Sequence, residues 1–452
     1  MLAAPLISAL VIALIVIWRM GPERAVLGLV VPVMMLWPYG TGWKFKGVEL
    51  DIMDAVVIPV AVALVFKYAR RWRYTLVDLL IFFYCFSTLL SNWNADGQSA
   101  GLALGTAMAL SCFPAYIIGR VAVERPGFRV ALVKRYAFLA FVISIFSVYE
   151  YRMEWNFFRI WSDKLFHNSS HLILQMRWGY GRIAGPYGHA ILAGCILLSA
   201  LLFAIWLASE GLWGEKFRNL SFLPGRKSMY IVLGLLLGVW MTQSRGPWMG
   251  GAFGILFILA ARARNQKRAL RNVVIVSLLL LTVFYTALNR YTNVNHAPSD
   301  IDQENAQYRR MLVINYTPVV ERGGMLGYGL HFPTIDGQVS IDNEYLNLAL
   351  TQGYLGLGIF TLIILITGGR LLRTIVVSRD RTETSFALCL LAVFVTIVLS
   401  ITTVYLGFQT FTLFFLIAGW AQELQPARAF AVAREPMEAY APVRFAFRRV
   451  WS

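Results

Sequence analysis

Four arginines have neighbours that are typical of an anion-binding site. Arg182 begins the segment Arg-Ile-Ala-Gly-Pro, Arg245 stands in Ser-Arg-Gly-Pro, and Arg309 and Arg310 are adjacent in a long polar stretch. A guanidinium group stays charged at any relevant pH, and its planar donors can bind two phosphate oxygens at once. Each arginine alone is more typical of a headgroup contact or a structural ion pair. Together they predict a pocket for a phosphate-bearing ligand.

A run of polar residues, Asp342-Asn343-Glu344, comes directly before an apolar segment. One interpretation is structural, because Asp, Asn and Glu are well suited to the N-cap and first turn of a helix. The other is chemical, because a carboxylate can act as a general base that takes the proton of an attacking hydroxyl group. The sequence leaves open which carboxylate would be the base, Asp342 or Glu344.

Other polar residues give weaker signals. His189 precedes a long apolar segment, and His331 lies in the polar stretch after Arg310; we expect both to line a pocket. The pair Asp300 and Asp302 has the spacing of a metal-binding Asp-x-Asp, but in a polar loop we interpret it as ordinary solvated sequence. The histidines lack the spacing of metal ligands. We therefore predict no metal and no cofactor.

The elements that must position these residues are apolar helices. Of the 452 residues 58% are apolar or aromatic and 14% are charged, whereas soluble domains average about 25% charged residues. This composition excludes a soluble globular protein. At roughly 20 residues per membrane-spanning helix, the apolar segments predict an all-α polytopic integral membrane protein with about 12–14 transmembrane helices.

The net charge of +17 indicates the orientation. Basic residues gather in alternate connections and in the C-terminal tail, and short cytoplasmic loops collect Lys and Arg. The other connections, which carry the four arginines and the acidic run, are therefore predicted to face outside. The basic clusters flank apolar segments and match no nucleic-acid-binding module, so membrane lipids are the expected partners rather than nucleic acid.

We divide the chain into five parts. They are N-terminal helices (1–135), central helices (136–288), a large outer loop (289–343), C-terminal helices (344–420) and a basic cytoplasmic tail (421–452). Within the central part, an interfacial segment, 150–181, is expected on the outer side because its aromatic residues recur at helical spacing.

Arg245 is the most informative arginine because its depth is predictable. It lies between the apolar segments 229–243 and 247–261, so its guanidinium must lie at or just below the outer membrane surface. Pro247 fits the first turn of a helix, whose free backbone N–H groups also favour anions. A diphosphate carried on a membrane lipid would have its charge at this depth.

The later apolar segments, by contrast, contain no Asp, Glu, Lys, Arg or His. Ion-coupled transporters commonly need such groups within the membrane. Their absence from these segments argues against an ion-driven pump.

Several motifs resemble those of the bacterial O-antigen ligase and polymerase superfamily. Asp342-Asn343, nine residues and then Gly353-Tyr-Leu-Gly is similar to the family signature of His-Asn/Ser, nine residues and Gly-x-x-Gly. Arg182-Ile-Ala-Gly-Pro, Ser244-Arg-Gly and Gly327-Tyr328-Gly329 are similar to other recurrent family segments, in the same order. The resemblance covers roughly residues 140–420.

The resemblance implies a metal-independent, GT-C-like glycosyltransferase that acts on the periplasmic face of the bacterial inner membrane. Its donor would be an undecaprenyl-diphosphate-linked oligosaccharide, with Arg182, Arg245 and either Arg309 or Arg310 as diphosphate ligands. The position of the signature histidine is occupied by Asp342, and Asn343, Tyr328, His189 and His331 would contact the substrate. An aspartate cannot reproduce the near-neutral titration of imidazole, but it can act as a base.

The Asp-Asn start of the signature resembles exopolysaccharide polymerases of the superfamily more than ligases. We therefore expect a polymerase of lipid-linked repeat units, which uses a glycan acceptor and works with a chain-length regulator. Two alternatives remain: an O-antigen ligase that transfers the glycan to lipid A-core or to protein, and a non-catalytic transporter of lipid-linked glycan.

Overall fold

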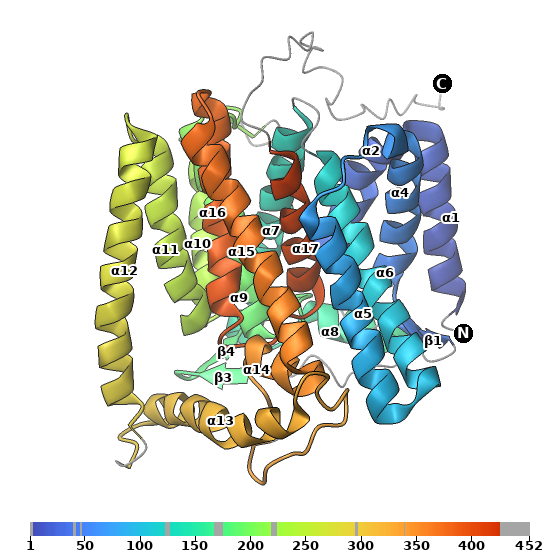
Figure 1. Cartoon of the computed structure of the whole chain (residues 1–452). Helices are drawn as coiled ribbons and strands as arrows, with labels where there is room; N and C mark the ends of the chain where they lie inside the picture. Colours follow the sequence, from blue (N-terminus) through green and yellow to red (C-terminus); the bar gives the residue numbers. More distant parts are fainter. Residues whose placement is uncertain are drawn as a thin grey trace.

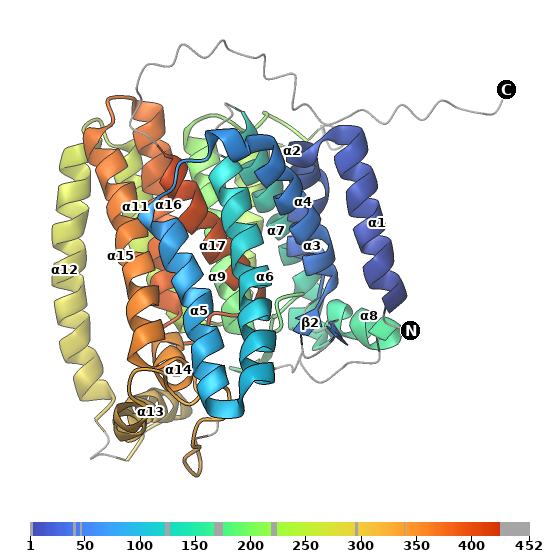
Figure 2. The ribbon, with the colours of Figure 1, turned by 45° about the vertical axis from the view of Figure 1, so that its right-hand side comes forward.

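The computed structural model describes residues 3–38, 42–45, 48–122, 127–166, 175–217, 224–293, 297–338 and 340–424. Long helices run up and down between two ends of the molecule, and shorter elements gather at one end (Figures 1 and 2). The all-α class predicted from the sequence is confirmed. The C-terminal part of the tail, from residue 425, lies outside the described residues.

The long apolar helices form the bundle. Their bounds are α1 (Ala3–Met20), α4 (Ile52–Tyr68), α5 (Leu76–Asp96), α6 (Gln98–Ala122), α7 (Phe128–Met153), α9 (Ala190–Ser209), α10 (Lys227–Met241), α11 (Arg245–Arg262), α12 (Gln266–Tyr291), α15 (Gly353–Val377), α16 (Arg381–Ser400) and α17 (Phe408–Glu423).

Shorter elements connect the helices. They are α2 (Pro22–Ala25), η1 (Val26–Val30), α3 (Val31–Leu36), η2 (Ala69–Arg71), α8 (Phe157–Phe166), α13 (Ile301–Gly323), α14 (Glu344–Thr351) and the hairpins β1 (Trp43–Phe45) with β2 (Val48–Leu50) and β3 (Gln175–Arg177) with β4 (Tyr180–Arg182).

Within the described residues, seven helices are long and apolar enough to cross a membrane. They are α5, α6, α7, α9, α12, α15 and α16, and α1 and α10 are shorter apolar helices. The chain is therefore a multi-pass membrane protein, although fewer helices meet this criterion than the 12–14 predicted. One reason is that the apolar stretch 25–38 is divided among α2, η1 and α3, which are all short.

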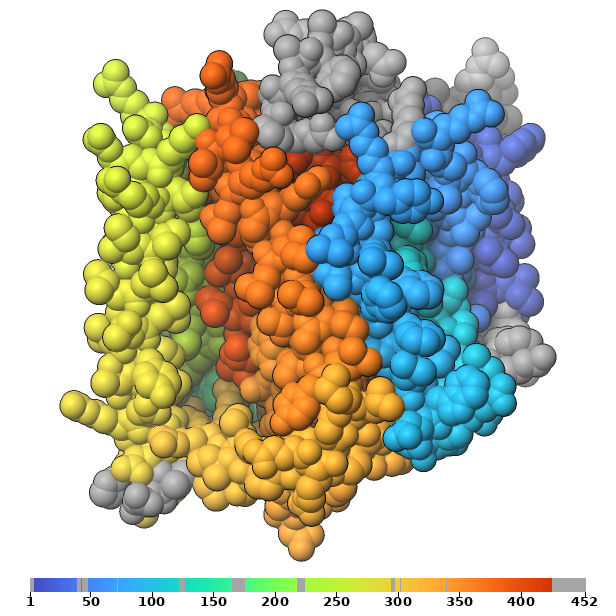
Figure 3. All heavy atoms as spheres, in the orientation of Figure 1, coloured from blue at the N-terminus to red at the C-terminus, as the bar shows by residue number. Residues whose placement is uncertain are grey.

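The helices differ in how much of their surface the protein covers. In α9, 94% of the apolar window is buried, because α7, α10, α11 and α16 surround this helix. In α12 none of the most apolar stretch is buried. In the view of Figure 3 a furrow separates α12 from α15 and α16. Although α12 packs against α11, its exposed apolar surface is stable only where lipid covers it, so this surface of α12 faces the bilayer.

Helices α6 and α17 cross at a contact made by glycine. A Cβ atom added at Gly119 would lie 2.0 Å from the carbonyl oxygen of Leu416, and one at Gly419 would lie 2.1 Å from that of Tyr116. Small residues allow such close approach of helix backbones within a membrane. This crossing anchors α17, whose N-terminal end borders the polar end of the molecule (Figure 1).

We expect Gly419→Leu to destabilise the protein by about 1–3 kcal/mol or more, because overpacking forces apart two backbones that cannot move independently. The matched control is Gly369→Leu in α15, where an added Cβ would meet nothing within 4 Å. Thermal unfolding of the purified protein in detergent measures both. Equal melting temperatures for the two variants would contradict this account of the crossing.

All the elements that carry the predicted site residues lie at one end of the bundle. Figures 1 and 2 show α8, α13 and α14 at this end, and Figure 1 adds the β3–β4 hairpin there; α1, α4 and α9 end at the other. Arg19 and Lys67, which we predicted to be cytoplasmic, lie in the last turns of α1 and α4. The alternation of basic and other connections in the sequence therefore matches the two ends of the structure.

Candidate functional site

The β3–β4 hairpin presents two arginines on one face. Its strands pair antiparallel, with Gln175 opposite Arg182 and Arg177 opposite Tyr180. The two turn residues, Trp178 and Gly179, have positive φ angles of 53° and 78°, as required by the two-residue turns that suit the twist of a hairpin. Directly opposed residues lie on the same face, and so do alternate residues of a strand. Arg177 and Arg182 therefore share a face.

This face holds the turn that precedes α11. Arg182 donates hydrogen bonds to the carbonyl oxygen of Thr242 at 3.1 Å, to Ser244 Oγ at 2.9 Å and to Gln175 Oε1 at 2.6 Å. Arg177 donates to the carbonyl oxygen of Gln243 at 2.8 Å. The hairpin thereby fixes the start of α11, where Arg245 is the first helical residue.

An aspartate from a distant segment neutralises part of this arginine group. The carboxylate of Asp302, in the first turn of α13, forms ion pairs with Arg245 and, at 3.3 Å, with Arg177. The Arg245 side chain remains 44% exposed, and its guanidinium and that of Arg177 both lie within 6 Å of the Trp178 ring centre. Asp302 thus occupies the position that an anionic ligand of these two arginines would take.

We expect Asp302→Asn to increase the affinity for inorganic diphosphate by about threefold to tenfold, because the variant no longer competes with the ligand for Arg177 and Arg245. Asp300→Asn is the matched control. It makes the same charge change two residues away, at the N-cap of α13, where Asn caps as well as Asp. Isothermal titration at fixed ionic strength compares the two. An equal gain in both variants would indicate a general charge effect and not competition.

The arginine group is crowded and partly removed from water. Burial, together with the charges of Arg177 and Arg309, lowers the pKa of Arg182 to about 10. Burial also lowers the pKa of Arg309. The charge of Arg177 lowers this pKa as well, whereas the charge of Asp342 opposes the shift. Three half-buried cations within reach of one another favour binding of a multivalent anion. We refer to Arg177, Arg182, Arg245 and Arg309 as the arginine cluster.

His189 lies beside the arginine cluster. It is the N-cap of α9, where its Nδ1 accepts a hydrogen bond from the backbone N–H of Ile191 at 3.1 Å. Its Nε2 lies 3.0 Å from the side-chain amide of Gln175, which also contacts Arg182. Burial and the charge of Arg182 lower the pKa of His189 to about 4, although Asp342 raises it. The ring is therefore neutral at pH 7 and adds no positive charge.

Asp342 lies between the arginine cluster and α14. Its Oδ1 accepts a hydrogen bond from Ser340 Oγ at 2.9 Å, and its charge raises the pKa values of Arg309 and His189. Within the described residues no basic side chain forms an ion pair with it. The carboxylate is thus close to the cations without being bound by one, as a base beside a diphosphate site must be.

Asn343 and Glu344 have structural partners. Asn343 is the N-cap of α14, and its Oδ1 accepts hydrogen bonds from the N–H groups of Tyr345 and Leu346. Glu344 is only 4% exposed, and its Oε2 accepts a hydrogen bond from the N–H of Leu406 at 2.8 Å. Burial raises the pKa of Glu344 to about 8. A carboxyl group that is protonated at pH 7 is not the general base, so the geometry favours Asp342.

Glu344 should make stability depend on pH. Because the pKa rises from 4.5 to about 8 on folding, the protonated carboxyl is favoured in the folded state. The protonated carboxyl of Glu344 makes its full contribution to the free energy of unfolding below about pH 4.5, and this contribution is lost as the pH rises through 8. We expect the melting temperature of the parent protein to fall from pH 5 to pH 9 relative to that of Glu344→Gln. Parallel curves for the two proteins would contradict the raised pKa.

The other predicted residues lie at the edge of this arrangement. Arg310 donates to the carbonyl oxygen of Asn289 and to Thr292 Oγ1, and so joins α13 to the end of α12. The hydroxyl of Tyr328 donates to the carbonyl oxygen of Val319 at 3.1 Å. His331 is 78% exposed and lies 3.0 Å from Asp96. Within the described ranges no group of three or more His, Cys, Asp or Glu could hold a metal ion.

Two members of the arrangement were not identified from the sequence. Arg177 lies in the segment that we interpreted as interfacial, although Trp178-Gly179 between two short polar and aromatic runs is a hairpin signal. Asp302 was explained as part of a solvated loop, whereas it pairs with Arg245, 57 residues away in the chain. No local pattern could reveal that pairing.

Comparison with known proteins agrees with these features. Residues 230–361 match the family model described as O-antigen ligase. The match includes Arg245, Asp302, Arg309 and Asp342, whereas the β3–β4 hairpin and His189 lie before it. No curated protein matches the chain. The family match confirms the resemblance on which the sequence analysis relied.

Proposed function

On the premise that the chain is a member of the O-antigen ligase and polymerase superfamily, we propose that it is a membrane glycosyltransferase. It polymerises undecaprenyl-diphosphate-linked oligosaccharide repeat units on the periplasmic face of the bacterial inner membrane. The observation that carries this proposal is the arginine cluster with an unpaired carboxylate, Asp342, at its edge. Such a pair of features suits a diphosphate leaving group and an attacking hydroxyl.

The arginine cluster would bind the diphosphate of the donor lipid. Arg309 has no ion-pair partner among the described residues, and Arg245 and Arg177 become available when Asp302 is displaced. Arg182 has three hydrogen-bond acceptors within the protein, so we assign it a positioning role that fixes the turn before Arg245. The N-terminal N–H groups of α11 add to the same positive region.

The reaction is a displacement at the anomeric carbon. Asp342 takes the proton from the acceptor hydroxyl, whose oxygen forms a bond to the anomeric carbon as the bond from that carbon to the diphosphate oxygen breaks. The electron pair of the broken bond leaves with undecaprenyl diphosphate, where the arginines stabilise the added charge. Attack from the side opposite the leaving group inverts the anomeric configuration. In this reaction the arginines supply the positive charge that balances the departing diphosphate, so the proposal needs no metal ion.

The family description also favours a second candidate, an O-antigen ligase that transfers finished glycan to lipid A-core or to protein. The two reactions share the donor and the leaving group and differ only in the acceptor. A polymerase makes longer chains from repeat units alone, whereas a ligase needs the second molecule.

Reconstitution distinguishes these functions. Full-length protein in liposomes is incubated with purified undecaprenyl-diphosphate-linked repeat units, with and without lipid A-core, and the product is sized by electrophoresis. We expect a ladder of longer glycans without lipid A-core. A product that forms only when lipid A-core is present would identify a ligase. Unchanged glycan length under both conditions would overturn the catalytic proposal and favour transport.

A further inference from the structure

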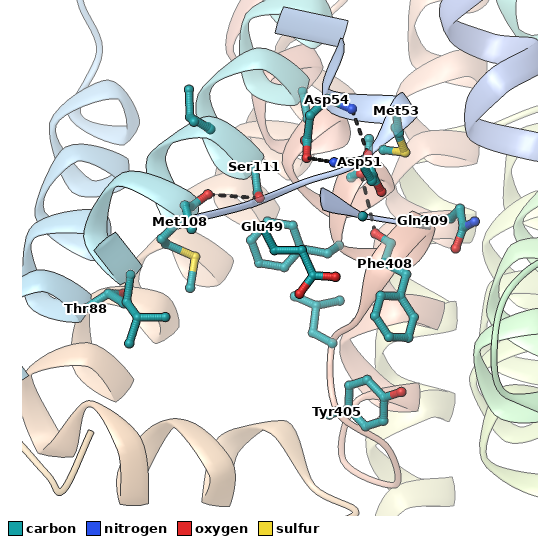
Figure 4. A pocket seen from close by; sticks show the side chains of 18 of the residues that line it. Glu49, Asp51, Met53, Asp54, Thr88, Met108, Ser111, Tyr405, Phe408 and Gln409 are labelled. Carbon is teal, nitrogen blue, oxygen red and sulfur yellow. Dashed lines mark hydrogen bonds between the residues drawn. The ribbon is translucent and has the colours of Figure 1, made fainter. Parts of the chain in front are cut away.

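A cavity of about 510 Å³ lies beside Asp342 and is separate from the arginine cluster. Its walls come from α4, α5, α6, α14, α17 and the segment 405–408 that precedes and begins α17. Tyr405 belongs to its lining and interacts electrostatically with Asp342. Figure 4 shows the open interior, with Glu49 and Tyr405 on its walls. Asp342 itself is not part of the lining, but it lies two residues before the lining residue Glu344, between the arginine cluster and this cavity along the chain.

The charge of the cavity is opposite to that of the arginine cluster. Its described lining residues include no Lys, Arg or His, and its acidic members are Glu49, Asp51, Asp54 and Glu344. Asp51 and Asp54 form a capping box at the start of α4, and burial is the main cause that raises the pKa of Asp51. The carboxylate of Glu49 points into the interior (Figure 4). Glu344 is protonated at pH 7, so the exposed carboxylate of Glu49 is the group that would repel a diphosphate or a uronate.

The remaining lining has the chemistry of a carbohydrate site. Aromatic side chains such as Trp37, Tyr405 and Phe408 offer faces on which sugar rings can stack, and side-chain amides offer hydrogen bonds. Gln409 is only 5% exposed, and its Nε2 donates to the carbonyl oxygen of Trp37 at 3.1 Å. Its Oε1 has no partner in the described part of the chain. A buried acceptor without a donor is costly, and a ligand hydroxyl would supply the donor.

We propose that this cavity is the acceptor subsite and that it selects an uncharged sugar at the end of the acceptor glycan. The inference rests on the proposed function, because it assigns the second substrate of the same reaction. The terminal sugar would stack on the aromatic residues and donate hydroxyl protons to carboxylates and to Gln409. Its reactive hydroxyl would face Asp342 at the border with the arginine cluster.

The separation of the two charged regions explains how one chain can bind two glycans in different roles. The donor diphosphate is directed to the arginine cluster, because the acidic cavity repels it. The uncharged end of the acceptor can enter the cavity, whereas the diphosphate of the same acceptor molecule remains outside. This arrangement prevents the acceptor from binding in the donor orientation.

The test measures binding without catalysis. The acceptor probe is the repeat-unit oligosaccharide released by mild acid from the lipid-linked pool of cells that make the polymer, and farnesyl diphosphate probes the arginine cluster. Titration of the full chain in nanodiscs gives both affinities. Ala107→Trp, in the part of α6 that lines the cavity, should weaken oligosaccharide binding at least tenfold and leave farnesyl diphosphate binding unchanged. Thr106→Trp, an exposed neighbour outside the lining, should change neither.

A second probe and a second variant test the charge selection. Oxidation of the primary hydroxyls of the oligosaccharide to carboxylates should weaken its binding to the parent protein at least tenfold. Glu49→Lys should reduce or reverse this preference, and it keeps the proposal testable if Ala107→Trp does not fold. Equal binding of the neutral and oxidised probes, or unchanged oligosaccharide binding by folded Ala107→Trp, would overturn the proposal. A phospholipid that occupies the cavity, with no oligosaccharide binding, would also overturn the proposal.

The outcomes also separate this inference from the proposed function. Selective oligosaccharide binding by a protein that never lengthens or transfers glycan would support the subsite and overturn the enzyme. Polymerisation with an acceptor KM that Ala107→Trp and Glu49→Lys leave unchanged would support the enzyme and overturn the subsite.

Discussion

Replacement of Asp342 by Asn is expected to lower the rate of glycosyl transfer by about 10²–10⁴-fold, the usual contribution of a positioned general base. Asn keeps the size and hydrogen-bonding capacity of the side chain, including the contact with Ser340, but it cannot accept the proton of the acceptor hydroxyl. The loss should therefore appear in kcat, with the KM for the donor lipid changed little. Single-turnover rates with reconstituted protein and excess enzyme measure the step directly.

The control for this substitution is Asp336→Asn. Asp336 is exposed and lies in the same connection between α13 and α14, so the change removes the same charge without touching the cluster. A second comparison is Glu344→Gln, which removes the other carboxylate of the run. If Glu344→Gln lost as much activity as Asp342→Asn is expected to lose, and Asp342→Asn stayed within threefold of the parent, the base would have been assigned to the wrong residue.

The sequence predicts the helices well because hydropathy is a local property. Each apolar segment identified from the sequence lies within or overlaps helices of the structure. Breaks within segments were not predicted. The continuous apolar stretch 345–369 consists of two helices, α14 and the first part of α15, joined at Gly353. This glycine has a φ of 66°, and an added Cβ would lie 2.4 Å from the carbonyl oxygen of Met325. Such a break depends on a tertiary contact that hydropathy does not detect.

The site was predictable only in part, for a similar reason. Arg245 and the polar run at Asp342 stand out because each lies at the boundary of an apolar segment, where a polar residue needs an explanation. The role of Asp302 depends on α13 bringing it to Arg245, and the burial of Glu344 depends on the backbone of Leu406. The sequence motif draws attention to Arg182, but only the structure reveals that its donors hold the protein's own turn.

The acidic cavity was not expected from the sequence, although one signal was present. Asp51 and Asp54 precede an apolar segment at the spacing of a capping box, which the structure forms. A capping box predicts a helix start and says nothing of a cavity. The cavity arises because the starts of α4 and α14 and the segment before α17 meet at one end of the bundle. Distant segments contribute each wall, so no window of the sequence contains it.

Replacement of Arg245 by Ala is expected to lower kcat/KM for the donor lipid by about 10²–10³-fold, the effect of removing one donor that stabilises a developing negative charge. The side chain of Arg245 is more exposed than that of Arg177, the other arginine that pairs with Asp302, and it lies at the first residue of α11, where the helix N-terminus adds to the positive field. Affinity for farnesyl diphosphate should fall with kcat/KM, whereas oligosaccharide binding to the acidic cavity should not change.

Asp302 provides a sharper version of the same experiment. In the parent protein this carboxylate competes with the donor for Arg245 and Arg177, so Asp302→Asn should strengthen donor binding more where Arg245 is present than where Arg177 alone is released. Addition of Asp302→Asn to Arg245→Ala should therefore restore less activity than it adds to the parent, which a double-mutant cycle measures as a coupling. Arg290→Ala, at an exposed arginine in the last turn of α12 at the same end of the bundle, is the control for net charge. Equal losses for Arg245→Ala and Arg290→Ala would mean that the surface charge attracts the donor and that Arg245 has no specific contact with its diphosphate.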